Sequence, residues 1–293
     1  MYLVTGASGH FGQLVIENLL KTHKIPAAKI IATTRHPEKL AALAALGVDV
    51  RAADFDKTDS LVAAFKGATR LLIISTDAMD RPGRRLEQHL NAIAAAEKAG
   101  VAHVIYTSMP KPETSAVLFA PDHLGTEKAL AGSSLKGWTV LRNNWYFENL
   151  FFSVPQALKS GSWYSAAGQG KIAHAGRADQ ARAAAAALAS NDNGKTTYTL
   201  TGAKEYTTDE IAKLVSATTG KPLTVVHVPV EGLIQGMVGA SLPEPMAKLF
   251  ASFDANTAQG GLSGVTGDIK KLTGTEPRAF EDWLKENAKA LAV

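Results

Sequence analysis

The chain opens with a short strand-forming segment that runs directly into a loop of regularly spaced glycines. Residues Tyr2–Thr5 (YLVT) have the composition of a buried strand, and Gly6, Gly9 and Gly12 follow at intervals of three. The first glycine allows a sharp turn, the second lets the backbone approach a diphosphate, and the third lets the next helix pack closely on the sheet. Apolar residues at helical spacing follow over 14–19. This context favours a βαβ unit that binds a dinucleotide over a plain glycine-rich turn.

Strand patterns and short helical patterns alternate through the first half of the chain. Strands separated by helices pair in parallel and are covered on both faces, so this order predicts an α/β protein with a doubly wound parallel-sheet Rossmann fold. A long helix is expected over 84–99, where apolar residues recur every three to four positions. The strands expected after the first are residues 29–34, 48–52, 70–74, 104–107 and 138–141.

The sequence texture changes after about residue 142, where glycine and proline become frequent and strand patterns become sparse. We expect residues 1–150 to form the Rossmann domain and residues 151–293 to form a smaller, mixed substrate-binding domain. Segments near 178–200 are expected to return to the first domain, because their alanine-rich stretch predicts a closely packed helix. The helices expected in the second half are residues 179–189, 209–219, 231–255 and 279–291.

Charge and cysteine content narrow the classes of function. The 31 basic and 27 acidic residues give a net charge of only +4, and there is no basic stripe with interleaved aromatics, so nucleic-acid binding is not indicated. The absence of cysteine excludes disulfides and thiolate catalysis, and the eight histidines lack the HxH and HExxH spacings of metal sites. The first strand starts at residue 2 and no apolar run approaches the roughly 18 residues of a membrane span, so we expect a soluble, cytoplasmic protein.

The end of the second expected strand indicates which dinucleotide binds. NAD-binding proteins commonly carry an acidic residue there for the ribose hydroxyls, whereas this strand ends Thr33-Thr34-Arg35-His36. The planar guanidinium of Arg35 suits a 2′-phosphate, which predicts NADPH as the cofactor; the alternative is a solvated arginine at a strand end. His36 and Lys39 either add positive charge nearby or are simply exposed at the start of the next helix.

Further candidates follow the next three strands, at the edge of the sheet where a cofactor would lie. Phe55 comes after the third strand and either stacks on the adenine or belongs to the core. Ser75 and Thr76 come after the fourth strand and are candidates for contact with the cofactor ribose. Residues 106–108 end the fifth strand, nearer the nicotinamide. Small hydroxyl residues also occur at such places as ordinary helix caps.

The acid–base pair of ordinary short-chain reductases is missing. Those enzymes protonate a carbonyl oxygen with a tyrosine paired to a lysine four residues later, and none of the six tyrosines has a lysine at that distance. Lys128 is preceded at that distance by Leu124, with His123 beside it. A quinone needs no such acid, because hydride addition yields a phenolate with a pKa of about 10, which water protonates. A cationic dye, which takes hydride at carbon, or a protein that binds NADP without catalysis, also fits.

Short segments spread along the chain carry a family resemblance: GASGHFG (6–12), TTRHPEK (33–39), ADFD (53–56), LLIIST (71–76), YTS (106–108), DHLGTEK (122–128), LRNNWYFEN (141–149), AAGQGKIAHAGRAD (166–179) and GGL (260–262). Together they resemble the NmrA-like atypical short-chain dehydrogenases. Within that family they are most similar to the zinc-independent type-2 NAD(P)H:quinone oxidoreductases, with the triphenylmethane-dye reductases a close second. Many families share the glycine loop, whereas HLGTEK and LRN-x-WY are more specific.

The resemblance implies a Rossmann domain, a smaller C-terminal substrate domain, and a cleft between them that binds NADPH beside Asn143. Two residues depart from the pattern: Phe55 replaces a common tyrosine, which removes a hydroxyl contact, and Asn144 replaces a smaller glycine, which narrows the cleft. His10 is expected to face solvent. The cofactor-binding residues so implied, together with Phe55, are Gly6, Ala7, Ser8, Gly9, His10, Phe11, Arg35, Ser75, Thr76, Asp77, Val140, Leu141, Arg142, Asn143, Asn144 and Trp145.

The candidates for contact with the acceptor are Asn143, Trp145, Tyr146 and His174. Trp145 and Tyr146 either form an aromatic wall for a flat ring or pack at a domain interface. His174 either contacts the substrate from the rim of the cleft or lies in a surface loop. No catalytic side chain is assigned, and no metal is expected.

The leading hypothesis for function is an NADPH-dependent reductase that transfers hydride to quinones without metal or flavin. The first alternative is a triphenylmethane or azo dye reductase, or another xenobiotic reductase, on the same scaffold. The second is a non-catalytic NADP(H)-binding redox sensor that regulates a protein partner. For an enzyme we expect a small quinone-like substrate, no nucleic acid or membrane partner, and a monomer or a homodimer.

Overall fold

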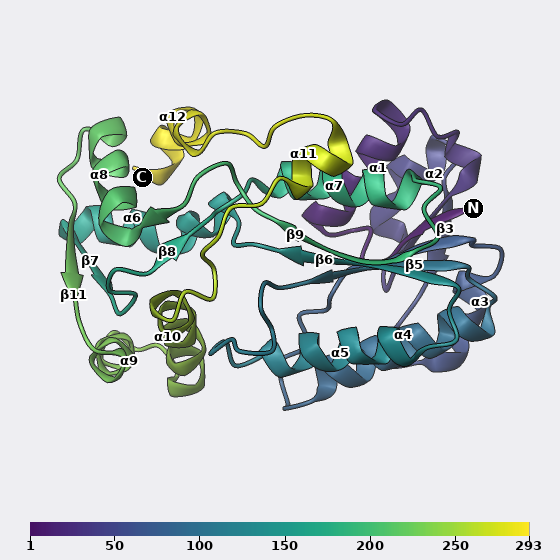
Figure 1. The fold of residues 1–293 in the computed structure, drawn as a ribbon, viewed down its shortest axis with the longest axis horizontal. Coiled ribbons are helices and arrows are strands. Elements are labelled where there is room, and N and C mark those ends of the chain that lie inside the picture. The colour runs from purple at the N-terminus through teal and green to yellow at the C-terminus, as the bar shows by residue number, and fades with distance from the viewer. Residues whose placement is uncertain (293) are drawn as a thin grey trace.

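A parallel sheet of seven strands forms the larger lobe of the molecule, as Figure 1 shows for residues 1–292, which the computed structural model describes. In spatial order the strands are β3 (Asp49–Ala52), β2 (Ile30–Thr34), β1 (Tyr2–Val4), β4 (Arg70–Ile73), β5 (His103–Ser108), β6 (Gly137–Asn143) and β9 (Lys195–Leu200). All neighbouring strands are parallel. The strand order reverses between β1 and β4, which confirms the predicted doubly wound Rossmann fold and creates a switch point there.

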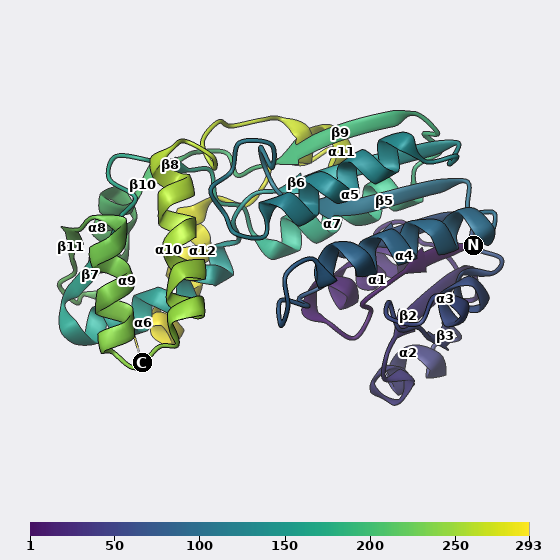
Figure 2. The same cartoon turned by 90° about the horizontal axis from the view of Figure 1, so that it is seen from below.

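Helices cover both faces of this sheet (Figures 1 and 2). One face carries α1 (His10–Lys21), α7 (Arg177–Ala189) and α11 (Asp268–Thr273); the other carries α3 (Thr58–Phe65), α4 (Arg84–Lys98) and α5 (Ala120–Gly132). Around β2 lie η1 (Ala27–Lys29), η2 (Pro37–Leu40) and α2 (Ala41–Ala45). Leu3 packs into the core of one face and Val4 into that of the other, because successive strand residues point to opposite sides. Of the helices within residues 1–292, none is both long and apolar enough to cross a membrane.

The alanine-rich helix α7 lies against α1, and its alanines from Ala183 to Ala187 are buried. Their small side chains allow the close packing that the composition predicted. Arg70, at the start of β4, is also buried, and its guanidinium donates to the carbonyl oxygens of Leu188 (2.9 Å) and Asp192 (2.7 Å). These bonds satisfy a buried charge and hold the C-terminal end of α7 at the sheet.

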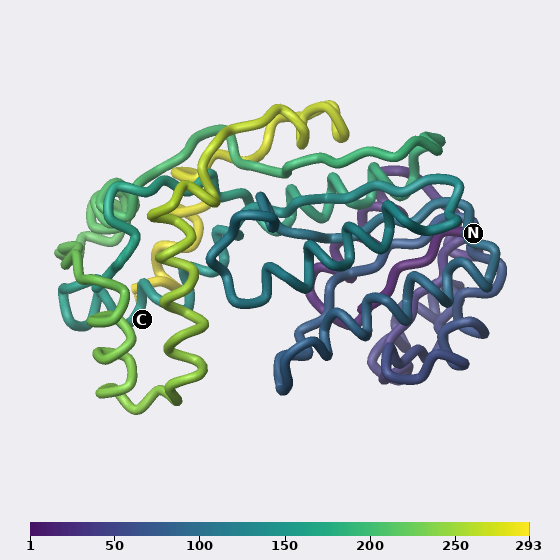
Figure 3. The backbone as a smooth tube through the Cα atoms, turned by 60° about the horizontal axis from the view of Figure 1, so that its bottom comes forward, coloured from purple at the N-terminus to yellow at the C-terminus, as the bar shows by residue number. Residues whose placement is uncertain are grey.

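The remaining elements build a smaller lobe with its own core, which includes Phe147, Val154, Trp283 and Leu284. Figure 3 shows the chain leaving the sheet after β6, returning for α7 and β9, and ending in this lobe. Strands β7 and β11 pair in parallel, and β8 and β10 pair antiparallel. The elements of this lobe are η3 (Phe147–Asn149), α6 (Leu150–Ser160), β7 (Ser162–Ser165), β8 (Lys171–Ile172), β10 (Tyr206–Thr207), α8 (Thr208–Thr219), β11 (Thr224–His227), α9 (Val230–Gly239), α10 (Glu244–Ala258) and α12 (Phe280–Leu291).

The helix expected over 231–255 is in fact two helices, α9 and α10. Between them Ser241 adopts a positive φ of 70°, and Pro243 has no N–H with which to continue a helix. Helix α8 begins with a capping box: the amide of Glu210 donates to Thr207 Oγ1 (3.2 Å), and the Glu210 carboxylate accepts from the Thr207 amide (2.8 Å). Strand patterns are sparse in this half of the sequence because each of its separate strands spans only two to four residues.

The carboxyl ends of the parallel strands face the smaller lobe (Figure 1). The loop after β5 touches α10 there, because the Ala116 amide donates to Asn256 Oδ1 (3.2 Å) and the Leu118 amide donates to Ser252 Oγ (3.4 Å). A ligand bound at the carboxyl edge of the sheet would therefore lie between the two lobes.

Candidate functional site

The loop between β1 and α1 depends on its glycines. Gly6 has a φ of 58°, which side chains disfavour. A Cβ on Gly12 would lie 2.6 Å from the carbonyl oxygen of Gly6 and 2.9 Å from Cα of Ala7, both of them backbone atoms. Gly9 caps α1 without a side chain, so no side chain caps the first amides of the helix, which are left available to an anion. This cradle fits the diphosphate of a dinucleotide.

The same loop is tied to the end of β2. The Ala7 amide donates to the carbonyl oxygen of Thr33 (3.0 Å), and Ser8 Oγ lies 2.9 Å from Thr34 Oγ1. The ring of Phe11 is in the core, so that residue can approach a ligand only through its backbone. His10 is exposed at the start of α1, in agreement with the expectation that it faces solvent.

Arg35 follows β2 directly, with an exposed side chain. Within the described part of the chain, its guanidinium forms no hydrogen bond or ion pair. The nearby His36 instead places Nδ1 3.3 Å from the Glu38 carboxylate, which offsets its charge when the ring is protonated. Arg35 is thus the guanidinium left available for an anion at this edge.

Phe55 follows β3 and is partly buried. Its ring packs against the core under α3 and α4, and its carbonyl oxygen accepts a hydrogen bond from Asn91 Nδ2 (2.9 Å). The ring covers part of the core and keeps some exposed surface. Stacking on an adenine stays a prediction.

Three consecutive backbone amides after β4 donate to side chains instead of to a neighbouring strand. Their acceptors are Thr5 Oγ1 for Ile74 (3.0 Å), Thr107 Oγ1 for Ser75 (2.9 Å) and His89 Nε2 for Thr76 (3.0 Å). The hydroxyl of Thr76 is buried and has no partner in the structure, and Asp77 beyond it is exposed. An unsatisfied hydroxyl at a switch point is available for contact with a ligand.

The resemblance implied cofactor contacts for four residues at the end of β6 whose side chains instead contact other parts of the protein. Val140 and Leu141 are buried, one in each core of the sheet. The guanidinium of Arg142 is paired with the carboxylates of Glu127 (2.7 Å) and Glu113 (3.2 Å), and these carboxylates raise its pKa against the effect of burial. The expectation that these side chains contact the cofactor therefore requires correction. Strand alternation directs them into the two cores or to the carboxylates, so only their backbone is left to meet a cofactor.

Asn144 is the fourth of these residues, and it connects the end of β6 to the segment between α10 and α11. Its Nδ2 donates to the carbonyl oxygen of Leu262 (3.0 Å), its Oδ1 accepts from the Trp145 amide (2.7 Å), and its carbonyl oxygen accepts from Gln180 Nε2 (2.8 Å). A glycine at this position would make no side-chain bonds. The asparagine side chain thus fastens the segment 260–263 to the end of β6 rather than narrowing an open cleft.

Asn143 ends β6, and only one of the two polar atoms of its buried side-chain amide has a hydrogen-bond partner. Its Nδ2 donates to the Tyr146 hydroxyl (3.3 Å), whereas its Oδ1 has no partner in the structure. The ring of Tyr146 lies between Phe11 (6.3 Å between centroids) and the guanidinium of Arg177 (5.1 Å). Burial raises the pKa of Tyr146, so this phenol is neutral and a poor proton donor at neutral pH.

Trp145 joins an aromatic cluster that spans the two lobes. Its ring meets that of Phe253 on α10 edge to face, with 4.7 Å between centroids. Phe253 in turn contacts Phe119 and Phe250, each at 6.0 Å between centroids. The packing alternative for Trp145 is confirmed, and a wall for a flat acceptor ring stays a prediction that the partly exposed ring allows.

His174 is neither on a rim nor in a surface loop. Its side chain is buried, with 4% exposure, and it stacks on Phe280 in the core of the smaller lobe (6.3 Å between centroids, 16° between planes). Burial lowers its pKa to about 3, so the ring is neutral. Its Nδ1 is buried without a partner among the described residues, and a substrate contact through this side chain stays a prediction.

Sequence reasoning missed a buried polar cluster beneath the ends of β4 and β5. It consists of Arg85 and His89 on α4, Tyr106 on β5, and His123 and Thr126 on α5. A signal was present, since Arg85 and His89 share one helix face at i, i+4, and His123 and Thr126 share another at i, i+3. Burial raises the pKa of Tyr106, which places its hydroxyl among protein partners rather than in a cleft.

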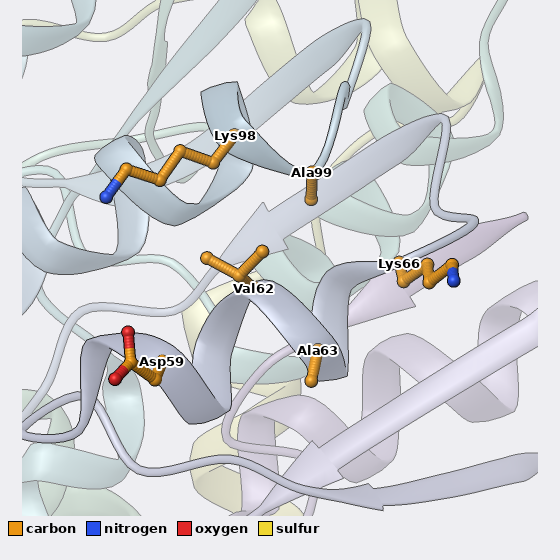
Figure 4. Close-up of a pocket in the computed structure, with 6 residues that line it drawn as sticks. All are labelled: Asp59, Val62, Ala63, Lys66, Lys98 and Ala99. Atoms are coloured by element: carbon orange, nitrogen blue, oxygen red, sulfur yellow. The ribbon is translucent and has the colours of Figure 1, made fainter.

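A depression between α3 and α4 is separate from this edge (Figure 4). It is lined by Asp59, Val62, Ala63, Lys66, Lys98 and Ala99. Lys98 ends α4, which leads into the start of β5, so the depression opens toward the amino edge of the sheet. It has no part in the candidate site.

The switch point, the cradle at Gly12 and the unsatisfied oxygens of Thr76 and Asn143 together define a dinucleotide-binding protein of the Rossmann class. The sequence then specifies which one. The chain belongs to the NmrA-like family, whose sequence profile matches residues 2–284.

Relatives from two bacteria are similar over nearly their whole length. Quinone oxidoreductase 2 of Escherichia coli (strain K12) is 39% identical over 274 residues, which is 94% of each chain. A crystal structure of NADPH-dependent quinone oxidoreductase from Escherichia coli, complexed with NADPH, superposes with a TM-score of 0.91 over 99% of each chain at 37% identity. The triphenylmethane reductase of Citrobacter sp. has a TM-score of 0.88 at 34% identity, over 98% of this chain and 99% of that one.

Proposed function

We propose that this protein is an NADPH-dependent reductase that passes a hydride to quinones, with no metal or flavin between donor and acceptor. The observation that carries the proposal is the end of β6, where the unpartnered Oδ1 of buried Asn143 is followed two residues later by the ring of Trp145. One group suits a carboxamide and the other suits a flat ring. The similarity to quinone oxidoreductases over nearly the whole chain supports the substrate class.

The residues of the switch point would hold the cofactor section by section. The N-terminal end of α1 and the loop Gly6–Gly9 would face the diphosphate, and Arg35 would pair with the 2′-phosphate. Ser75 and Thr76 would lie along the ribose, and Asn143 would orient the nicotinamide carboxamide. NADPH, when bound, supplies the hydride. The protein contributes orientation and exclusion of water.

The aromatic cluster around Trp145 would hold the acceptor ring. Trp145 and Phe253 meet edge to face, and Phe250 is 40% exposed beside them. Aromatic surface of this kind binds flat, electron-poor rings without prescribing polar substituents. This accommodates quinones of different size and explains why dye reductases occur among the relatives.

Among the described residues, this edge carries no acidic side chain that has a lowered pKa and is placed to protonate an acceptor. The phenols of Tyr106 and Tyr146 are buried with raised pKa values, and Lys128 is exposed on α5. A reduced quinone does not need such a donor, because its phenolate has a pKa of about 10 and water protonates it. The proposed chemistry is consistent with this set of side chains, whereas ketone reduction is not.

We further infer that one lobe binds the cofactor and the other binds the acceptor. Residues 1–150, with 178–200 and α11, would bind the cofactor, and the rest of 151–293 would supply the acceptor wall. The site is built from one chain, so both a monomer and a homodimer fit the proposal. A cytoplasmic location, where NADPH is available, belongs to the same proposal.

The test of the proposed function is NADPH oxidation measured against a panel of quinones and triphenylmethane or azo dyes. We expect turnover with quinones and slower turnover with dyes. Faster turnover with dyes would favour a dye reductase on this scaffold. Tight NADPH binding without oxidation by any acceptor would favour a redox sensor and contradict the proposal.

Substitution of Arg35 tests the choice of cofactor. In R35D a carboxylate replaces the guanidinium opposite the 2′-phosphate, and loss of a charge-assisted contact costs about 1.5–3 kcal/mol. We therefore expect the dissociation constant for NADPH to rise by roughly 10- to 100-fold, while that for NADH changes less than about twofold. The matched control is K29D, which makes the same charge change just before the other end of β2 and should alter neither constant. Equal losses for both cofactors in R35D would contradict the 2′-phosphate contact.

A further inference from the structure

The segment after β4 is held by side chains from three different elements. The amides of Ile74, Ser75 and Thr76 all donate to side chains, at 2.9–3.0 Å, where a longer strand would have donated to neighbouring backbone. Within residues 1–292, no hydrogen bond reaches the carbonyl oxygens of Ser75 or Thr76. The backbone amides of this segment thus all donate within the protein, whereas the carbonyl oxygens of Ser75 and Thr76 stay free at the edge of the sheet.

His89 is the acceptor for the last of these amides. Its ring on α4 is 0% exposed, and its Nε2 accepts the Thr76 N–H at 3.0 Å. A backbone N–H only donates, so Nε2 carries no proton and the neutral ring is protonated on Nδ1. That Nδ1–H points to Thr126 Oγ1 (2.9 Å), whose own proton goes to the carbonyl oxygen of Asp122 (2.6 Å).

His123 repeats this arrangement beside it. Arg85 Nη2 lies 3.0 Å from His123 Nε2, and a guanidinium only donates, so His123 is also protonated on Nδ1. Its Nδ1–H then donates to the Tyr106 hydroxyl (2.8 Å), which lies 3.3 Å from His89 Nδ1. The guanidinium of Arg85 also lies over the ring of Phe119, 4.6 Å from its centroid.

Both histidines of the cluster are therefore neutral and protonated on Nδ1. Burial, and then the charge of Arg85, lower the pKa of His89 to about 3 and that of His123 well below its usual value. All five side chains of the cluster are buried, and polar contacts of 2.8–3.3 Å connect Arg85 through His123, Tyr106 and His89 to the backbone amide of Thr76. Such a network fixes the position of the amide at its end.

We propose that His89 is a positioning residue for the cofactor: through the Thr76 amide it holds the segment 74–76 with its carbonyl oxygens and the Thr76 hydroxyl directed to the site. Tyr106, His123 and Arg85 act through His89 by fixing its ring. The inference rests on the proposed function for the identity of the ligand, NADP(H). The role is separate from hydride transfer, because the histidine contacts backbone and not the reacting atoms.

Affinity measurements on paired histidine variants test this role. H89L removes the acceptor for Thr76, and we expect the dissociation constant for NADP⁺, measured by calorimetry below the melting range, to rise about tenfold. H89Q restores an acceptor oxygen and should recover most of the affinity. The matched control is H103L: His103 is also 0% exposed and also bonds one hydroxyl, that of Thr139 (2.8 Å), but at the amino edge of the sheet. H103L should lose stability and keep its affinity within about twofold.

Unchanged affinity in H89L, or equal losses in H89L and H103L, would overturn the role of His89. Nitrogen-15 NMR of the unsubstituted protein gives a second test that needs no variant to fold. Both His89 and His123 should be in the Nδ1–H form, whereas a proton on Nε2 of His89 would overturn the inference. Neither measurement uses an acceptor, so a protein without quinone turnover that gives the expected affinities and ring protons supports this inference while contradicting the proposed function.

Discussion

Substitution of Gly12 by alanine weakens NADPH binding by up to about 100-fold, the largest effect on affinity that we expect from a single methyl group. The new Cβ would lie 2.6 Å from the carbonyl oxygen of Gly6 and 2.9 Å from Cα of Ala7. Both neighbours are backbone, so the loop itself must move, and overpacking of this kind costs roughly 1–3 kcal/mol. The loop that moves is the one that faces the diphosphate. Calorimetric titration with NADPH measures the loss, and thermal unfolding measures any loss of stability.

The control for this prediction is G236A. Gly236 lies inside α9, its φ is not positive, and a Cβ there would meet nothing within 4 Å. The substitution should leave NADPH affinity unchanged and raise the free energy of unfolding by up to about 1 kcal/mol, because alanine is the better helix former. NADPH affinity in G12A equal to that of the unsubstituted protein would show that the cradle is not a cofactor site.

Acidification from pH 7.5 to pH 5.5 removes about 5 kcal/mol from the free energy of unfolding. Burial lowers the pKa of His89 and His174 to about 3 and of His103 to about 4, and it lowers the pKa of His123 well below its usual value. In the unfolded chain each ring has a pKa near 6.5, so below that pH the unfolded state binds protons that the folded state does not bind. Each histidine then costs about 1.3 kcal/mol over this interval. The total is a large share of the 5–15 kcal/mol typical of a folded domain.

The sign is specific to these groups. Their stabilising effect is complete above pH 6.5 and declines as the pH falls toward the folded-state pKa values. Asp254 acts in the opposite direction, because burial raises the pKa of its carboxyl. Urea unfolding at pH 7.5, 6.5 and 5.5 measures the effect. The variant H174F removes one titrating ring and should reduce the pH dependence by about a quarter, whereas stability independent of pH over this range would contradict the neutral state of the four histidines.

Predictions from local sequence patterns hold best in the larger lobe. The strands expected at 29–34, 48–52 and 70–74 match β2, β3 and β4 to within one or two residues. These are fully or partly buried segments bounded by turns, and their pattern depends only on nearby residues. In the smaller lobe the strands have at most four residues, too few for a period to be recognised, and one expected helix is broken at Pro243.

In the candidate site too, local patterns are easier to predict from the sequence than contacts between distant segments. The roles expected of Gly6, Gly12 and Arg35 follow from backbone geometry and strand ends, which spacing along the chain reveals. The side-chain partners of His174 and Arg142, by contrast, come from distant segments. Phe280 covers His174, and Glu127 and Glu113 bind Arg142. The residues close to either position in the sequence do not predict those contacts.

The sequence by itself determined the fold class, the dinucleotide loop and the absence of a tyrosine–lysine acid pair, because each depends on residue types at short, regular intervals. Only the tertiary structure decided which polar side chains serve the site and which serve the interior. His89 and Thr76 are 13 residues apart, and Arg85 and His123 are 38 apart, yet each pair meets at 3.0 Å. The same types of residue, histidine and arginine, can bind a ligand or hold a strand end. Burial and the direction of each hydrogen bond, which the packing of α4 and α5 on the sheet imposes, make that choice.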